Sequence, residues 1–315
     1  MTEIFNNELE KRVFFALQKG IQISHEPLAQ ISLELQISET EIASMCDSFR
    51  NRGLVRRFGA VFEPSKIGYK SVLCAVSLDD KSCSDFTDNI QRIKGITHCY
   101  TRHNKYNVWF TFTAQERAFS NSLDKLRRFV SSEILEFHSV RKFKTEVIFN
   151  LGLLSEIKQT HAPATNISIE FDTQDLELAK TLYDISLSEN ALKAIDENSL
   201  SRLKSWKNSF ALKRIGLIPY HRSIGYKANA MCVWNVKKEQ IEPAGKKLSL
   251  NPQITHCYER KTEIEKFPFN LFAMLHASTD SELRREFDKM SDEAGLRNGE
   301  MLTTLSEIKK TSFYP

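Results

Sequence analysis

Residues 97–102 read Thr-His-Cys-Tyr-Thr-Arg, and residues 255–260 repeat them as Thr-His-Cys-Tyr-Glu-Arg. In both copies an Ile precedes the Thr, and an aromatic residue, an Asn and an apolar run follow a few positions later. Apolar and polar residues alternate through each copy, which is typical of a half-buried β-strand. Because successive side chains of a strand point to opposite faces, we expect His98 and Tyr100 on one face and Cys99 on the other.

The repeat extends outward from this motif in a nearly constant register. Arg57-Phe-Gly-Ala-Val matches Arg214-Ile-Gly-Leu-Ile at an offset of 157 residues (214 − 57). The offset is 158 at the two motif threonines and 163 at Asn107 and Asn270, so the second copy carries an insertion after Arg260. A register that changes only at loops indicates an internal duplication.

Each copy reads as a helical module followed by a sheet module. Three short helices and a strand form a winged helix-turn-helix pattern, predicted at residues 8–20, 28–35, 38–52 and 54–61. The elements after it follow the order βαββαβ, which is the ferredoxin-like arrangement. They are predicted as strand 69–78, helix 84–93, strands 96–102 and 107–113, helix 116–130 and strand 135–147.

The predicted fold class is therefore α+β, a tandem repeat of a winged helix-turn-helix and a ferredoxin-like domain. A stretch rich in Ser, Thr, Ala and Asn separates the halves, and the helical module of the second half is shorter. The predicted domains are winged helix-turn-helix 1–62, ferredoxin-like 63–150, linker 151–174, abbreviated winged helix-turn-helix 175–219 and ferredoxin-like 220–315.

Composition narrows the class of protein. The chain has 315 residues, a net charge of +4 and six cysteines without a C-x-x-C pair. This pattern predicts reduced thiols in the cytoplasm and no metal site. No apolar run is long enough for a membrane span, and the N-terminus does not resemble a signal peptide. The mild charge suits an anionic small molecule and gives little support to a nucleic-acid binder.

A winged helix-turn-helix followed by a βαββαβ domain resembles the Lrp/AsnC regulators, which dimerise through their ferredoxin-like domains. The resemblance implies a ligand-sensing transcription factor as one candidate function. The sequence of the expected recognition helix argues against a transcription factor. Its exposed residues include Glu39, Glu41 and Asp47, whereas binding to DNA phosphates requires Arg or Lys. We expect no specific DNA binding.

A second resemblance covers nearly the whole chain. Arg56-Arg-Phe-Gly-Ala-Val, His98-Cys-Tyr-Thr-Arg-His103 and Tyr106-Asn-Val-Trp resemble one subunit type of sirohaem decarboxylase, an Lrp-like enzyme of haem d1 or alternative haem biosynthesis. Segments of the second half resemble the other subunit type: Lys213-Arg-Ile-Gly, Pro219-Tyr-His221, His256-Cys-Tyr-Glu-Arg260 and Pro268-Phe-Asn-Leu-Phe-Ala-Met-Leu-His276. The resemblance implies a fusion of both types into an intrachain pseudo-dimer, with further homo-oligomerisation left open.

The resemblance also implies a substrate. Sirohaem, an iron tetrapyrrole with eight carboxylates, would lose CO2 from its C12 and C18 acetates to give 12,18-didecarboxysirohaem. Iron would enter with the substrate, and no flavin, pyridoxal or thiamine signature indicates a separate cofactor. A haem-binding carrier without catalysis is a weaker alternative.

The chemistry calls for two kinds of residue. Arg and Lys bind the carboxylates that remain, and His supplies a proton because its pKa lies near working pH. Any single His here has a structural alternative, and recurrence in both copies favours function for His98 and His256. The candidate proton donors are His98, His256, His103, His221 and His276. The candidate substrate-binding residues are Arg56, Arg57, Arg102, Tyr100, Tyr106, Asn107, Lys213, Arg214, Tyr258, Arg260 and Asn270. We expect Arg57, Tyr100 and Arg102 to group with His98, and Arg214, Tyr258 and Arg260 with His256.

Overall fold

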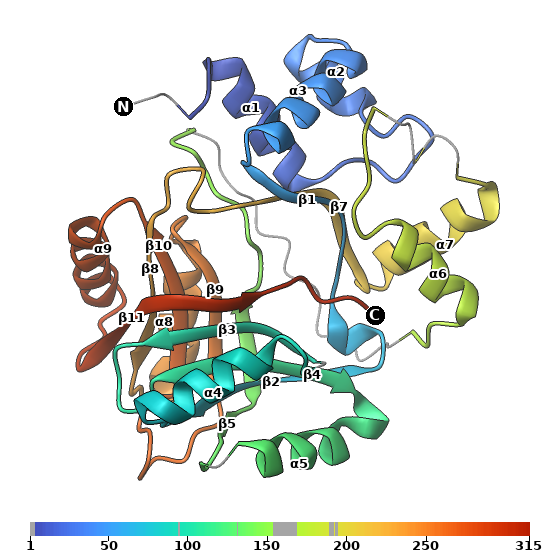
Figure 1. Ribbon diagram of the computed structural model, residues 1–315. Helices are drawn as coiled ribbons and strands as arrows, with labels where there is room; N and C mark the ends of the chain where they lie inside the picture. The colour runs from blue at the N-terminus through green and yellow to red at the C-terminus, as the bar shows by residue number, and fades with distance from the viewer. Residues whose placement is uncertain (1–3, 94, 131, 154–168, 189–191, 193–194) are drawn as a thin grey trace. The chain divides into compact units, whose positions relative to one another are not determined.

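The computed structural model describes residues 4–93, 95–130, 132–153, 169–188, 192 and 195–315 (Figure 1). Contacts divide the chain into two compact units. The helical unit consists of Met1–Gly68, Ile148–Tyr226 and Phe313–Pro315, and the sheet unit of Tyr69–Val147 and Lys227–Ser312. The predicted domain boundaries stay predictions, and residues 154–168 of the expected linker lie outside the described residues.

The helical unit combines helices and one strand from each half of the chain. Its elements are α1 (Glu8–Lys19), α2 (Ala29–Leu35), α3 (Glu39–Asn51), β1 (Val55–Phe62), a 3₁₀ turn (Pro64–Lys66), α6 (Thr173–Thr181), α7 (Glu197–Asn208) and β7 (Leu212–Pro219). A capping box starts α3, since Ser38 Oγ accepts from the Glu41 amide at 3.2 Å and Glu41 Oε2 accepts from the Ser38 amide at 2.8 Å.

The strands β1 and β7 join the two halves of this unit. They pair antiparallel, with Gly59 opposite Gly216. A Cβ atom on Gly59 would lie 2.3 Å from the Tyr183 carbonyl oxygen, so this close approach of two backbones requires glycine. The two strands that sequence reading assigns to separate helical modules therefore form one ribbon.

The sheet unit contains two modules, residues 69–147 and 227–312, each with the predicted βαββαβ order. The first module has β2 (Tyr69–Val76), α4 (Asp80–Ile90), β3 (Ile96–Arg102), β4 (Val108–Gln115), a 3₁₀ turn (Glu116–Ala118), α5 (Phe119–Phe129), β5 (Leu135–Phe137) and β6 (Ser139–Lys144). The second has β8 (Ala228–Trp234), α8 (Lys238–Leu250), β9 (Ile254–Arg260), β10 (Leu271–Ala277), α9 (Asp280–Glu293) and β11 (Gly299–Lys310).

The two modules exchange their last strands. The described strands of this unit form one sheet in the order β5-β2-β4-β3-β11-β8-β10-β9-β6. β11 pairs with β8 in its own module and continues beside β3, where Lys309 lies opposite Cys99. β6 pairs with β9 of the second module, where Lys144 lies opposite Cys257. Each module therefore completes the sheet of the other.

Two predicted elements need correction. The single strand expected at residues 135–147 is interrupted at His138, because the chain there stops pairing with β2 and starts pairing with β9. The helix expected at 84–93 begins earlier, at Asp80, because the Asp79 side chain accepts from the Ser82 amide and caps it.

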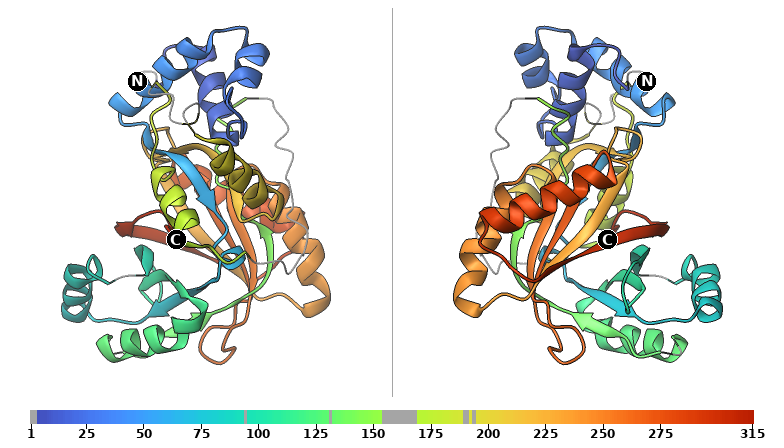
Figure 2. Two further views of the ribbon diagram at one scale, coloured as in Figure 1. Left: turned by 90° about the vertical axis from the view of Figure 1, so that its right-hand side faces the viewer. Right: turned by 90° about the vertical axis from the view of Figure 1, so that its left-hand side faces the viewer.

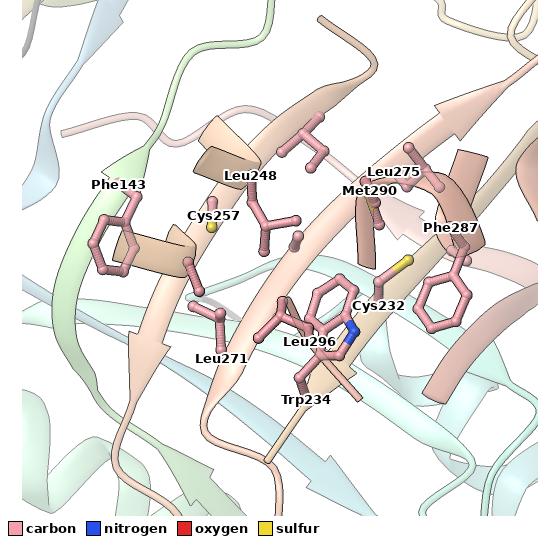
Figure 3. Packing of buried hydrophobic residues seen from close by; sticks show 14 of the residues in the cluster. Phe143, Cys232, Trp234, Leu248, Cys257, Leu271, Leu275, Phe287, Met290 and Leu296 are labelled. Atoms are coloured by element: carbon pink, nitrogen blue, oxygen red, sulfur yellow. The ribbon is translucent and has the colours of Figure 1, made fainter. Parts of the chain in front are cut away.

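The core of the sheet unit consists of three clusters of buried apolar side chains. Cys74 and Phe110 pack against α4 and α5, and Trp234 and Cys257 pack against α8 and α9 (Figure 3). Figure 2 shows α8 and α9 on one face of the strands of their module. The opposite faces of the two modules pack against each other in a cluster that includes Trp109, Phe137, Met231, Val233, Phe267 and Phe272. We call this opposite face the inner face of each module. Alternation along the strands thus separates a helix-covered face from an inner face.

Phe143 shows how closely an exchanged strand is packed. It lies on β6 of the first module and belongs to the core of the second (Figure 3). A Cβ atom on Gly245 of α8 would meet its ring at 2.4 Å. The absence of a side chain at Gly245 therefore makes room for the phenyl ring of the exchanged strand.

Candidate functional site

The two recurring histidines lie on the inner faces, as predicted from strand alternation. Cys99 and Cys257 are buried against the helices of their modules, so His98 and His256 point the other way with their neighbouring tyrosines. Both histidines are half-buried. The His256 ring lies nearly parallel to the Tyr258 ring, with centroids 6.1 Å apart and an interplanar angle of 13°.

Each histidine contacts the threonine that precedes it. His98 Nδ1 lies 3.0 Å from Thr97 Oγ1, and His256 Nδ1 lies 3.1 Å from Thr255 Oγ1. In the second module Thr255 Oγ1 also lies 3.1 Å from His276 Nε2. This contact places His276, which is buried, in the same polar group as His256.

Arg102 ends β3 and reaches into the second module. Its Nη1 donates to the Leu302 carbonyl oxygen at 3.0 Å and to Thr304 Oγ1 at 2.9 Å. Its guanidinium carbon lies 5.3 Å from the centroid of the Tyr100 ring, and Nη2 is 3.8 Å from the Met274 sulfur. Arg102 is buried, and burial lowers the pKa of its guanidinium to about 10, so it stays charged at neutral pH.

Arg260 occupies the corresponding place in the second module. Its Nη1 donates to the Phe137 carbonyl oxygen at 2.9 Å, and its guanidinium carbon lies 4.5 Å from the Tyr258 ring centroid and 5.7 Å from that of Phe272. Burial lowers the pKa of this guanidinium to about 10. The two arginines therefore repeat one arrangement, a guanidinium bound to a carbonyl of the other module and stacked on a tyrosine.

Neither arginine is neutralised by a carboxylate. Within the described ranges, Arg102 and Arg260 form no ion pair with Asp or Glu, and the Nε atom of each is buried without a hydrogen-bond partner. A desolvated cation without a counter-ion is costly. Both positions are therefore suited to an anionic ligand.

The grouping of Arg102 with His98 stays a prediction, and the structure adds a contact that it did not include. The guanidinium of Arg102 lies beside Met274, whose strand partner in the sheet is His256. Because β11 is exchanged, the arginine of the first module contacts the sheet that carries the histidine of the second. Strand exchange is a long-range feature, and the local motif held no sign of it.

The predicted basic residues of the wing strands belong to the helical unit. Arg57 is buried, donates to the carbonyl oxygens of Tyr183 and Ala60, and lies over the Tyr183 ring. Burial lowers its pKa to about 10. Lys213 forms an ion pair of 2.8 Å with Glu63. Arg214 and His221 are buried and Arg56 is half-buried.

Four predicted site residues have other surroundings. Asn107 binds both the carbonyl and the amide of Leu78, and Asn270 does the same with Val236. These two amides hold the ends of neighbouring strands, which explains why they recur. Tyr106 lies in the core between the modules, 6.3 Å from the Phe267 ring, and His103 is exposed.

Several residues of this arrangement were not singled out from the sequence. Thr255, Asn229 and Thr304 connect the predicted side chains, since Thr304 Oγ1 also donates to Asn229 Oδ1 at 2.7 Å. The repeated Thr-His pair is the one local signal that pointed to Thr97 and Thr255. A depression of about 530 Å³ between α6 and α7 contains none of the predicted side chains.

The described residues contain no cluster of three or more His, Cys, Asp or Glu side chains suited to a metal ion. Among them, no helix has the length and apolar character needed to span a membrane.

Comparison with known proteins identifies the class. Residues 66–144 and 223–309 match the model of the AsnC-like ligand binding domain, so the chain is a tandem protein of the AsnC-like class. A crystal structure of the siroheme decarboxylase NirDL superposes with a TM-score of 0.70 at 23% identity, covering 98% of this chain and 94% of that one. Another, in co-complex with an iron-uroporphyrin III analogue, gives 0.67 over the same share of each chain.

Two curated relatives narrow the class further. The siroheme decarboxylase of Hydrogenobacter thermophilus is 28% identical over 315 residues, which cover 96% of this chain and 93% of the relative. The siroheme decarboxylase beta subunit of Methanosarcina barkeri is 34% identical over 148 residues, which cover 44% of this chain and 97% of that subunit. This chain belongs to the sirohaem decarboxylase family, in the fused form that carries two AsnC-like domains.

Proposed function

We propose that this protein decarboxylates sirohaem at the acetate side chains of C12 and C18, giving 12,18-didecarboxysirohaem. His256 and His98 act as proton donors, and Arg102 and Arg260 bind carboxylates that are not lost. The family supports the overall reaction, and the residue roles rest on the contacts of the sheet unit.

The observation that carries the proposal is the pair of arginines without a counter-ion. Each keeps unused hydrogen-bonding capacity at Nε while its Nη1 is anchored to a backbone carbonyl. Guanidinium groups bind carboxylates strongly and with defined geometry. Tyr100 and Tyr258 stack on these guanidinium groups and provide aromatic surface for a planar macrocycle. Two such places suit a substrate that carries many carboxylates on one ring.

The reaction needs a proton at each carbon that loses CO2. The bond between the acetate methylene and its carboxylate breaks, CO2 leaves, and the electron pair remains on the methylene carbon, delocalised into the tetrapyrrole. A histidine N–H then delivers one proton and leaves a methyl group, so the step involves no net oxidation. Nδ1 of His98 and of His256 faces a threonine hydroxyl, and we assign the delivery of the proton to Nε2.

The direct test is incubation of the purified protein with sirohaem under anaerobic conditions, followed by mass analysis of the tetrapyrrole. Loss of two CO2 is expected, whereas binding without loss would indicate a carrier and contradict the proposal. Replacing His256 by Ala should slow at least one decarboxylation by about 10² to 10⁴, the usual contribution of a positioned acid.

A matched control for this variant is His25→Ala. His25 is exposed and pairs with Glu197 in the helical unit, so the rate should not change. If His98→Ala and His256→Ala both retain the full rate of double decarboxylation, the assignment of the donors is wrong and the remaining candidates, His103, His221 and His276, should be replaced in turn.

A further inference from the structure

The inserted segment of the second module turns one aromatic side chain into the core. Residues 261–268 stand where the first copy has only residues 103–105. Phe267 is the buried member of this segment, at 2% exposure, whereas Ile264 is 73% exposed. The amide of Phe267 donates to the Glu263 carbonyl oxygen at 2.8 Å and closes a turn around Ile264. The insertion therefore brings into the core of the sheet unit a phenyl ring that the first copy lacks.

Phe267 packs on two of the residues that support Arg260. Its ring centroid lies 5.2 Å from that of Phe137 and 6.0 Å from that of Phe272. Phe137 supplies the carbonyl oxygen that accepts from Arg260 Nη1 at 2.9 Å, and the centroid of the Phe272 ring lies 5.7 Å from the guanidinium carbon. Close packing transmits small displacements between side chains in contact. The position of the Phe267 ring is therefore coupled to the position of the guanidinium.

The base of the inserted segment is fixed at the bend between β5 and β6. The amide of Lys261 donates to the His138 carbonyl oxygen at 2.9 Å, and the preceding residue, Arg260, binds the carbonyl of Phe137. Two consecutive residues thus bind two consecutive carbonyls at this bend. The double attachment sets the path of the chain into the insertion and places Phe267 against the Phe137 ring.

The arginine of the first module has a different support. Arg102 lies opposite Thr304 in the sheet, and its Nη1 donates to the Thr304 hydroxyl in addition to a backbone carbonyl. The strand partner of Arg260 is Ser139, which is exposed. Within the described part of the chain, the hydrogen bond to the Phe137 carbonyl is the one that Arg260 forms. The orientation of Arg260 therefore depends on the aromatic packing around Phe137, whereas a hydroxyl helps to orient Arg102.

One edge of the Arg260 guanidinium is left for a ligand. A guanidinium binds a carboxylate through two parallel N–H···O bonds, and the edge formed by Nε and Nη2 has the geometry for both. Among the described residues, neither Nε nor Nη2 of Arg260 forms a hydrogen bond, and Nε is buried. Both bonds to a carboxylate depend on the direction of the guanidinium plane, so a small rotation would misalign them together.

We propose that Phe267 is a positioning residue that fixes the guanidinium plane of Arg260, so that the Nε and Nη2 edge binds one carboxylate of the substrate side-on. The assignment of this carboxylate to sirohaem rests on the proposed function. Phe267 acts through Arg260 and takes no part in the chemistry. The insertion of the second module thereby gives this arginine the fixed direction that bidentate binding requires.

A double-mutant cycle in sirohaem affinity, measured by spectral titration, tests this coupling. Phe267→Leu keeps an apolar side chain in the core and removes the ring. In the wild-type background it should weaken binding by about threefold to tenfold, within the usual range for residues in contact. In Arg260→Met it should cause no further loss, whereas in Arg102→Met the full loss should remain. Ile264→Ala, a change in the exposed part of the same segment, should leave the affinity at the wild-type value.

A second measurement reports on the arginine without any ligand. In protein labelled with ¹⁵N-arginine, the Nε–H signal of Arg260 is identified by its loss in Arg260→Met, and that of Arg102 by its loss in Arg102→Met. We expect Phe267→Leu to speed the exchange of the Arg260 Nε–H with water by about threefold or more, because looser packing raises the population of open states. The Arg102 signal should not change, and Ile264→Ala should affect neither signal.

The outcomes separate this inference from the proposed function. Equal losses of affinity from Phe267→Leu in Arg260→Met and in Arg102→Met would overturn the positioning role, and so would unchanged exchange of the Arg260 signal. If the exchange changes as expected while the wild-type protein leaves sirohaem intact, the positioning role holds and the proposed function fails. If the wild-type protein removes two CO2 while the exchange is unchanged, the function holds and the positioning role fails.

Discussion

Arg260 donates a hydrogen bond from Nη1 to the carbonyl oxygen of Phe137 at 2.9 Å. The first module repeats this relationship, with Arg102 bound to the carbonyl of Leu302 at 3.0 Å. A carbonyl fixes the direction of a guanidinium and leaves its charge intact, whereas a carboxylate would neutralise it. The repeat therefore conserves two oriented positive charges inside a largely apolar unit.

Replacing either arginine by methionine should weaken binding more than folding. A hydrogen bond to a charged group contributes roughly 1.5–3 kcal/mol, so the affinity for sirohaem should fall by about tenfold to a hundredfold in Arg102→Met and in Arg260→Met. The free energy of unfolding should change by less than about 1 kcal/mol, because removing a desolvated charge offsets the lost hydrogen bonds. Spectral titration with sirohaem and denaturant unfolding measure the two effects.

Arg141→Met is the matched control for these variants. Arg141 is exposed and pairs with Glu242 of α8, and an exposed ion pair contributes about 0–1 kcal/mol. Its removal should leave both affinity and stability near the wild-type values. Normal affinity combined with a large loss of stability in Arg102→Met and Arg260→Met would assign the two arginines to the scaffold.

Lys144 on the exchanged strand β6 should make the free energy of unfolding depend on pH. Lys144 is buried, its Nζ donates to the Asn251 carbonyl at 2.8 Å, and burial lowers its pKa to about 8. An unfolded lysine has a pKa near 10.4, so between these values the unfolded chain binds a proton that the folded chain has released. The contribution of Lys144 to the free energy of unfolding therefore rises as pH increases from about 8 to about 10.

Lys144→Met isolates this contribution from other titrating groups, including the buried cysteines. The variant should gain stability relative to the wild type at pH 7, and this advantage should shrink between about pH 8 and pH 10. Denaturant unfolding of both proteins across this range provides the comparison. A difference that stays constant with pH would show that Lys144 does not titrate in this interval.

The contact between Gly245 and Phe143 should reverse the usual effect of alanine in a helix. Gly→Ala within a helix normally stabilises by up to about 1 kcal/mol. Here the new Cβ would lie 2.4 Å from the phenyl ring, so Gly245→Ala should destabilise by roughly 1–3 kcal/mol, the usual cost of overpacking.

A double-mutant cycle with Phe143→Leu checks this cause by denaturant unfolding. In the smaller Phe143→Leu core, the penalty of Gly245→Ala should be largely relieved. Additive effects of the two substitutions would rule out the proposed clash.

The helical unit should not bind DNA specifically. The basic residues near the end of α3 are already engaged, Arg50 with Asp184 at 2.6 Å and Arg52 with Glu10 at 2.9 Å. The start of the helix presents Glu41, an acidic side chain, to solvent. At physiological salt we expect only non-specific affinity, about 10⁻⁴ to 10⁻⁶ M or weaker. Fluorescence anisotropy with promoter fragments would contradict this if it detected a sequence-dependent nanomolar complex.

The sequence predicted the local architecture because strand alternation and repeat register depend on residues that are near each other in the chain. Alternation around Cys99 and Cys257 placed the histidines on the correct face. The register of the repeat indicated the tandem fold, which the match of two AsnC-like domains confirms.

The pairing of strands from different modules could not be predicted from the sequence. The motif around Arg102 gives no sign that β11 will lie beside it, and so the contact of its guanidinium with Met274 was not predicted. Recurrence in both halves also did not distinguish ligand-binding residues from structural ones. Asn107 and Asn270 recur, and each binds the backbone at the end of a neighbouring strand. A structural need preserved in both halves looks the same in sequence as a shared ligand contact.

Strand exchange has a consequence for synthesis on the ribosome. The partner of β3 is β11, which ends at Lys310, so β3, which ends at Arg102, is made about two hundred residues before this neighbour. Throughout that interval the edge of β3 has unpaired backbone amides and carbonyls, and such an edge can pair with other chains. Nascent chains stalled before β11 should therefore need chaperone protection that the finished protein does not.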